Sequence, residues 1–236
     1  MFRDLPGQLY TSLIANDRWM LYLEGLGRTI VMALGAVLVG LFLGTLVAVI
    51  KVNKVYAKKP GILLKIGDWL CDFYLTVIRG TPAVIQLLIA VNVIFAAAPI
   101  SSSLYVAIVA FGINSGAYVA EIIRAGIMAV DRGQMEAGRS LGLSNGMTMQ
   151  KIILPQAVKN ILPAMGNEFI TLIKETAVVG YVAVEDLTKM AELIQSRTYQ
   201  PLVPLLLSAL IYLALVMLLS AALKKLERRL ARSDNR

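Results

Sequence analysis

The sequence lacks most of the residues from which a catalytic centre is built. Its 236 residues include no histidine and one cysteine, Cys71. Without histidine there can be no Ser-His dyad, so the serine of Gly112–Gly116 (GINSG) is not read as a protease nucleophile, and histidine-based zinc sites are excluded. The sequence has no Gly-x-x-x-x-Gly-Lys-Ser/Thr phosphate loop, so the chain cannot itself hydrolyse ATP. We expect no catalytic residue, metal site or cofactor in this chain.

The charged side chains within apolar segments are the best candidates in this sequence for binding a ligand or forming ion pairs. Segment 161–184 contains Glu168, Lys174 and Glu175. A charge at the centre of a membrane helix costs about 2.5 to 3.5 kcal/mol, so each of these side chains needs a partner or water. Lys174 or Glu175 could pair with Arg79. Glu168 could bind a substrate ammonium or a structural partner, and both alternatives stay open.

Other polar residues lie on the neighbouring apolar segments. Glu121 and Arg124 are three residues apart, a spacing that favours a mutual ion pair on a helix. Uncharged polar side chains could line a path for a polar solute, or could instead join helices by hydrogen bonds. These side chains are Gln86, Asn92, Asn114, Ser115 and Tyr118. We predict a substrate path near Asn114, Tyr118 and Glu168, with Gln86 and Asn92 contributing.

A polar, glycine-punctuated stretch runs from Glu136 to Pro155, EAGRSLGLSNGMTMQKIILP. Two short helices joined by a sharp turn fit this stretch, because Gly142 can adopt a positive φ and Ser144 can cap the second helix. Such a hairpin could dock on another protein or lie on lipid headgroups. The side chains expected to form its docking face are Leu143, Met147 and Ile152.

Apolar segments long enough to cross a bilayer make up most of the chain. Hydrophobic residues are 58% of the total, too many for one aqueous core. A helix needs about 20 residues to cross about 30 Å of hydrocarbon. The candidate segments are 29–50, 83–100, 104–120, 161–184 and 202–223. We predict an all-α, polytopic membrane protein with five transmembrane helices and a break near Pro82, which cannot continue a helix.

Basic residues predict the orientation in the membrane. Sixteen Lys and Arg residues follow the first span, surround the glycine-punctuated loop or follow the last span. Such residues stay on the cytoplasmic side, so the N-terminus is expected outside and the C-terminus inside. The predicted parts are an external interfacial segment 1–24, a transmembrane domain 25–225 with a cytoplasmic loop 131–159, and a basic tail 226–236.

The net charge of +8 does not indicate nucleic-acid binding. The cations lie at the ends of the predicted spans, where anionic lipid headgroups satisfy them. Membrane lipids are therefore expected partners.

Several motifs resemble the permease subunits of bacterial ATP-binding-cassette importers, in their polar-amino-acid branch. One of these motifs resembles the "EAA" signature, the loop on which the ATPase docks in these importers. The residues that carry this resemblance by their spacing are Glu136, Ala137, Gly138, Gly142, Ile152, Leu154 and Pro155. The resemblance extends over about residues 25–225. The other matching motifs are Arg79–Pro82 (RGTP) with Gln86-Leu87, Ala117–Arg124 (AYVAEIIR), Pro155–Ala157 (PQA), Asn160–Ala164 (NILPA), Asn167-Glu168 and Lys174–Thr176 (KET).

The sequence departs from this branch at three places. Gly138 stands where alanine is usual, which should soften a helix by about 1 kcal/mol. Thr76 stands where an acid is usual, which bears on the charge of the substrate. Gly180–Ala183 (GYVA) replaces a Ser-Val-Ile-Gly run at the outer gate.

The resemblance implies a type I importer fold in a bacterial cytoplasmic membrane. The implied partners are two ATPase subunits that carry ATP and Mg, a second permease that is identical or closely homologous, and an extracytoplasmic substrate-binding protein. The implied cargo is a polar amino acid. One alternative is the same architecture with another solute, such as methionine or an organic anion. The other is a stand-alone secondary carrier, although five spans do not divide into two inverted repeats.

Overall fold

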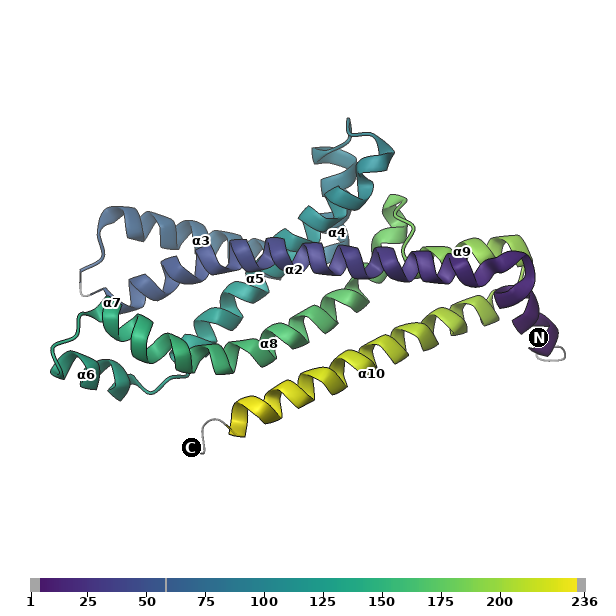
Figure 1. Cartoon of the computed structure of the whole chain (residues 1–236). Coiled ribbons are helices and arrows are strands. Elements are labelled where there is room, and N and C mark those ends of the chain that lie inside the picture. Colours follow the sequence, from purple (N-terminus) through teal and green to yellow (C-terminus); the bar gives the residue numbers. More distant parts are fainter. Residues whose placement is uncertain (1–4, 58, 233–236) are drawn as a thin grey trace. The chain divides into compact units, whose positions relative to one another are not determined.

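The computed structural model describes residues 5–57 and 59–232, and it contains helices and turns but no strand in these ranges (Figure 1). The all-α prediction is therefore confirmed. The α-helices are α1 (Leu5–Leu9), α2 (Arg18–Tyr56), α3 (Ile62–Gly80), α4 (Ala83–Ile89), α5 (Ser103–Met128), α6 (Arg132–Ser140), α7 (Asn145–Thr148), α8 (Leu154–Glu175), α9 (Leu187–Thr198) and α10 (Leu202–Arg232). The π-helical turns are η1 (Tyr10–Ile14), η3 (Ala90–Ile94) and η5 (Met149–Ile153), and the 3₁₀ turns are η2 (Ala15–Asp17), η4 (Ile100–Ser102) and η6 (Thr176–Val182).

Proline and left-handed residues interrupt the helices. α3 ends at Gly80 and α4 begins at Ala83, so the predicted break around Pro82 is confirmed. Asn16 and Asp17, at φ 55° and 53°, separate the N-terminal turns from α2. Pro163 lies nine residues after Leu154, the first residue of α8. It therefore lies in the helix interior, where it leaves one helical carbonyl without its usual donor.

The chain forms two compact units, which are described separately. Among the described residues, unit 1 contains 5–36, 83–111 and 170–220, and unit 2 contains 37–82, 112–169 and 221–232. The four long helices α2, α5, α8 and α10 each begin in one unit and end in the other. The predicted tail 226–236 begins as the last turns of α10, and residues 1–4 and 233–236 lie outside the described residues.

Unit 1 has a core in which α9 packs against the start of α2 and part of α10. Tyr22, Leu187, Ala191 and Ile194 are at most 2% exposed in this core. Gly25 allows the close approach, because a Cβ there would lie 2.8 Å from the Cα of Leu187. A side chain at this position would force the helices apart.

Unit 2 has a core that joins the glycine-punctuated loop to three long helices. Its buried members are Val52 on α2, Ile127 and Val130 at and beyond the end of α5, Met135 on α6, Ile153 at the end of η5 and Ala157 in the first turn of α8. The loop is therefore packed onto the helix ends. Within the same unit α2 lies close against α5, because a Cβ on Gly44 would be 2.6 Å from Cγ1 of Val119. This close contact is the kind that small residues permit between membrane helices.

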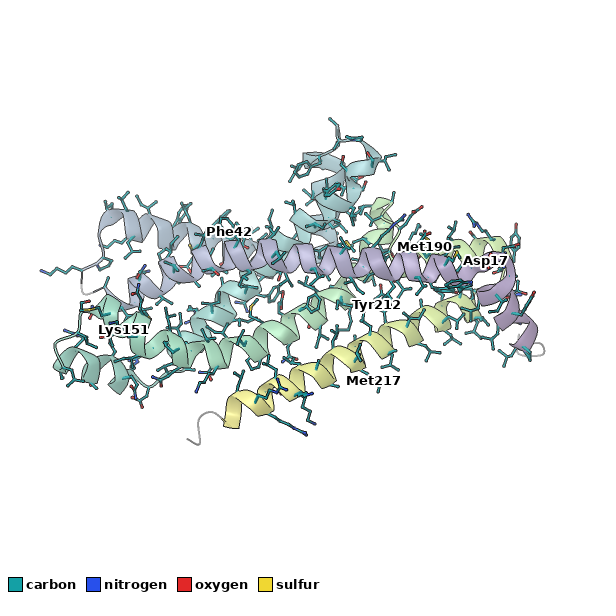
Figure 2. All side chains as sticks on the ribbon, viewed as in Figure 1. Asp17, Phe42, Lys151, Met190, Tyr212 and Met217 are labelled. Carbon is teal, nitrogen blue, oxygen red and sulfur yellow. The ribbon has the colours of Figure 1, made fainter. Side chains whose placement is uncertain are left out.

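Three described helical stretches are long and apolar enough to cross a membrane: Leu5–Tyr56, Ile100–Met128 and Leu202–Leu230. The bent pair Ile62–Gly80 and Ala83–Ile94 makes a fourth if it is counted as one span. A multi-pass membrane protein follows from these stretches. Many of their exposed side chains are apolar, as with Phe42 and Met217, which are 66% and 63% exposed (Figure 2). The predicted fifth span, on the more charged α8, stays a prediction.

Candidate functional site

The loop 131–159 folds into a helical hairpin within unit 2 (Figure 1). Asp131 is the N-cap residue of α6, and its side chain accepts a hydrogen bond from the Gly133 backbone amide at 2.6 Å. Ser144 is the N-cap residue of α7, and its hydroxyl accepts a hydrogen bond from the Met147 backbone amide at 3.3 Å. The prediction of two short helices with Ser144 as a cap is confirmed. Caps of this kind satisfy amides that a helix leaves without partners.

The turn between the two helices requires a glycine. Gly142 has φ +84°, in the left-handed region. The Leu143 amide donates to the Gly138 carbonyl at 3.1 Å and the Gly142 amide donates to the Arg139 carbonyl at 3.0 Å. This pair of bonds is a Schellman motif, which ends a helix on a left-handed residue. The predicted positive φ of Gly142 is confirmed.

Gly138 contributes a close contact rather than flexibility. It is buried, and a Cβ there would lie 2.5 Å from Cγ2 and 2.8 Å from Oγ1 of Thr148, and 3.2 Å from Cδ1 of Ile152. Thr148 is itself fully buried. The expectation that glycine merely softens α6 therefore misses its main effect, which is to let α6 lie directly against the second arm of the hairpin.

The exposed surface of the hairpin differs from the predicted docking face. Met147 is 41% exposed, but Leu143 and Ile152 are only partly exposed. Leu141, at the end of α6, is 81% exposed and is the apolar side chain that sequence reasoning missed. Leu141 and Leu143 both flank Gly142, so no signal in the sequence distinguishes the exposed leucine from the partly exposed one. Of the remaining predicted residues, Glu136, Ala137 and Pro155 are exposed and Leu154 is partly buried; Lys151, on η5, is labelled in Figure 2.

A charged cavity of about 760 Å³ lies elsewhere in unit 2, among α2, α3 and α5. Its cations are Lys51, Lys54, Arg79 and Arg124, and its acids are Asp68, Asp72 and Glu121. Thr76, where an acid was expected from the resemblance, also lines it.

The least exposed acid that lines this cavity is Asp68, whose side chain is 3% exposed. Lys51 Nζ lies 2.9 Å from Asp68 Oδ1 and 2.6 Å from Asp72 Oδ1, and Lys54 forms an ion pair with Asp68. Two cations thus compensate the buried carboxylate, which a charge in this environment requires. Sequence reasoning missed the cluster, because its members lie on separate helices, α2 and α3.

The ion pair predicted on α5 is present. Arg124 Nε donates to Glu121 Oε2 at 3.0 Å, and the guanidinium makes a second bond to Oε1. The guanidinium of Arg79, near the same acid, lies over the ring of Tyr118, 5.6 Å from the centroid. The predicted pairing of Arg79 with Lys174 or Glu175 stays a prediction, since those two exposed residues belong to unit 1.

The predicted substrate-path residues of α5 and α8 come together in part. Ser115 is fully buried and donates a hydrogen bond to Glu168 Oε1 at 2.8 Å. Asn114 is buried on α5, and Tyr118 is 39% exposed one turn further on. Gln86 and Asn92 belong to unit 1, where the Asn92 amide donates to the Leu88 carbonyl at 2.9 Å. The contribution of these two residues to the path is therefore not established.

Unit 1 contains a buried polar cluster that the sequence did not indicate. Asp186 is fully buried and caps α9, where its carboxylate accepts bonds from the Thr188 and Lys189 amides at 3.2 and 2.9 Å. The Tyr212 hydroxyl donates to the same carboxylate at 3.1 Å. Burial raises the pKa of Asp186, and the hydrogen bonds oppose that shift. The cluster fixes α9 to α10 within the unit.

Helices long and apolar enough to cross a membrane, a broken helix and a packed helical hairpin are the main features of the described residues, and they fit a membrane-embedded protein. The chain belongs to the family described as "binding-protein-dependent transport system inner membrane component", whose model matches residues 61–232.

Named relatives agree with this membership. The chain is 41% identical to the arginine transport system permease protein ArtQ of Bacillus subtilis (strain 168), over 90% of this chain and 93% of the relative. It is 34% identical to the L-cystine transport system permease protein TcyB of the same organism, over 94% and 91%. Among solved structures, the crystal structure of an amino acid ABC transporter with histidines matches with a TM-score of 0.80 and 42% identity, over 89% of this chain and 94% of that chain.

Proposed function

We propose that this chain is the permease subunit of a bacterial ATP-binding-cassette importer for a polar amino acid. The observation that carries the proposal is the 41% identity with an arginine permease over 90% of the chain, within a family of binding-protein-dependent transport components. The capped hairpin with its Schellman turn supports it. The chain has no phosphate loop, so a partner ATPase supplies ATP hydrolysis and holds the nucleotide and Mg.

The proposed topology has five spans, with the N-terminus outside and the C-terminus in the cytoplasm. Four spans follow from length and hydropathy if the bent pair counts as one. The fifth is α8, whose 22 residues extend about 33 Å. The hydrogen bond from Ser115 compensates one of its charges, Glu168. The concentration of Lys and Arg around the hairpin and in the last turns of α10 supports the orientation.

The proposed coupling surface is the hairpin. Closure of two ATPases on ATP would draw two hairpins together and favour the outward-facing state, because the hairpins make different contacts in the two states. Leu141 and Met147, the exposed apolar side chains, would enter the ATPase surface. The residues assigned to coupling are Glu136, Ala137, Gly138, Leu141, Gly142, Leu143, Met147, Ile152, Leu154 and Pro155.

The proposed substrate path follows the polar side chains of α5 and α8. Asn114, Ser115, Tyr118 and Glu168 supply hydrogen-bonding groups on these two helices. A zwitterion needs such groups to leave water. Gln86 and Asn92 are assigned to the same path from α4 and η3.

The proposed assembly contains two permeases, two ATPases and an external binding protein, in the bacterial cytoplasmic membrane. The family description supports the binding protein, and the apolar exposed helices support lipid contact. A methionine or organic-anion importer is not favoured, because the two relatives named above are arginine and cystine permeases. A stand-alone carrier is not favoured by a family of binding-protein-dependent components.

The test is uptake by the complete complex in proteoliposomes. Labelled arginine, glutamine and cystine are offered with the binding protein outside and ATP inside. We expect ATP-dependent accumulation of at least one of them, and none when ATP or the binding protein is left out. Accumulation that continues without ATP would show a secondary carrier instead.

A further inference from the structure

We propose that Arg79 is a binding site for the carboxylate of the transported amino acid, an inference that rests on the function proposed above. Arg79 is exposed and lines the charged cavity of unit 2. The volume of that cavity, about 760 Å³, falls in the range of about 300 to 1,000 Å³ that small-molecule sites occupy. A site of this size can hold an amino acid with part of its hydration shell.

The charges of the cavity leave one cation available. Asp68 and Asp72 are bound by Lys51 and Lys54. Glu121 is bound through both of its oxygens by Arg124. Four cations therefore face three acids, and each acid is already paired with a cation other than Arg79. Within the described part of the chain, Arg79 forms no ion pair, so its guanidinium is the group that can accept an added carboxylate.

The position of Arg79 is fixed by an aromatic ring. Its guanidinium carbon lies 5.6 Å from the centroid of Tyr118, a contact that occupies one face of the planar group and leaves the N–H groups at its edge for hydrogen bonds. Arginine presents these donors in a fork that matches the two oxygens of a carboxylate. Tyr118 is one helical turn before Glu121 on α5, so the fork lies at the wall of the cavity near the Glu121–Arg124 pair.

The ligand is identified by its chemistry, which is that of a carboxylate. A lipid phosphate could also bind a guanidinium, and the test separates the two sources. The probes are labelled L-glutamine and L-arginine, together with their carboxamides, which lack only the negative carboxylate. Binding is measured on the permease–ATPase complex without binding protein, in nanodiscs of neutral lipid and in nanodiscs with anionic lipid.

Arg79→Gln is expected to weaken binding of the amino acid about 10- to 100-fold, the effect of one charge-assisted hydrogen-bonded pair. The same substitution should leave binding of the carboxamide unchanged, because the carboxamide has no charge for Arg79 to bind. Arg79→Lys should be intermediate, since it keeps the charge and loses the fork, and it carries the test if Arg79→Gln does not assemble. Lys65→Gln is the matched control, because Lys65 is an exposed cation on the same helix outside the cavity.

Three results would overturn the inference. Equal weakening of the acid and its carboxamide would show that Arg79 is only structural. Unchanged binding of the acid would show that another group holds the carboxylate. A loss seen only in nanodiscs with anionic lipid would assign Arg79 to a lipid phosphate. Failure of the unsubstituted complex to bind any of the probes would instead count against the proposed function itself.

Discussion

Replacement of Gly142 is the sharpest test of the hairpin, because a matched control lies four residues away. Gly142 and Gly146 are both in the hairpin, and a Cβ built on either meets nothing within 4 Å. The two positions differ in backbone, since Gly142 has φ +84° and Gly146 lies in α7. The same Gly→Ala change at each position therefore separates backbone strain from steric contact.

The two alanine substitutions are expected to change the stability of the hairpin in opposite directions. At Gly142 an alanine in the left-handed region costs about 1 to 2 kcal/mol, which corresponds to a factor of about 5 to 30 in the population of the folded turn. At Gly146 an alanine gains up to about 1 kcal/mol of helix propensity. Gly142→Asn should be milder than Gly142→Ala, because asparagine tolerates the left-handed region better. Gly142→Asp also adds a charge to the docking face and should abolish uptake while the protein still inserts.

The assay is ATP-dependent uptake by the reconstituted complex, with hydrogen exchange at the Leu143 amide as the local readout. That amide donates to the Gly138 carbonyl, so its exchange reports opening of the turn. Faster exchange and reduced uptake in Gly142→Ala, with neither change in Gly146→Ala, would support the reasoning. Equal effects at the two glycines, or an asparagine as harmful as the alanine, would refute it.

Three further predictions concern topology, charge and pH. A reporter fused after Arg236 should be cytoplasmic and one placed before Phe2 external; an external C-terminus would overturn the five-span proposal. Glu168→Gln should reduce uptake of arginine far more than that of glutamine if Glu168 binds a cationic substrate. A uniform loss that follows protein yield would make Glu168 structural. Burial raises the pKa of Asp186 above its usual 3.8, so the folded protein holds the carboxyl proton more tightly than the unfolded chain does. The stabilisation that results should be fully present below pH 3.8 and should be lost as the pH rises through the raised pKa. Asp186→Asn should remove that part of the pH dependence of the melting temperature, and an unchanged profile would contradict the assignment.

Local features of the hairpin were predictable because they depend on neighbouring residues. Glycine at a sharp turn and serine before a short helix follow from backbone geometry alone, and both occur as expected at Gly142 and Ser144. The i, i+3 ion pair of Glu121 with Arg124 was predictable for the same reason. Each of these features needs only the chain within a few residues.

Features that join distant segments were not predictable in the same way. Lys51 and Asp68 are seventeen positions apart on different helices, and their ion pair depends on how α2 and α3 pack in unit 2. The contact of Gly138 with Thr148 depends on the angle at which the hairpin closes. The burial of Asp186 against Tyr212 likewise comes from the packing of α9 on α10.

The helix α8 limits where residues can be inserted into this chain. It runs without a loop from Leu154, in the hairpin, to Glu168, a distance of fourteen residues or about 21 Å along the axis. One residue inserted between these points would turn Glu168 by about 100° relative to the hairpin, away from Ser115. The number of residues in this interval therefore sets the direction in which Glu168 faces relative to the hairpin, and with it the hydrogen bond from Ser115.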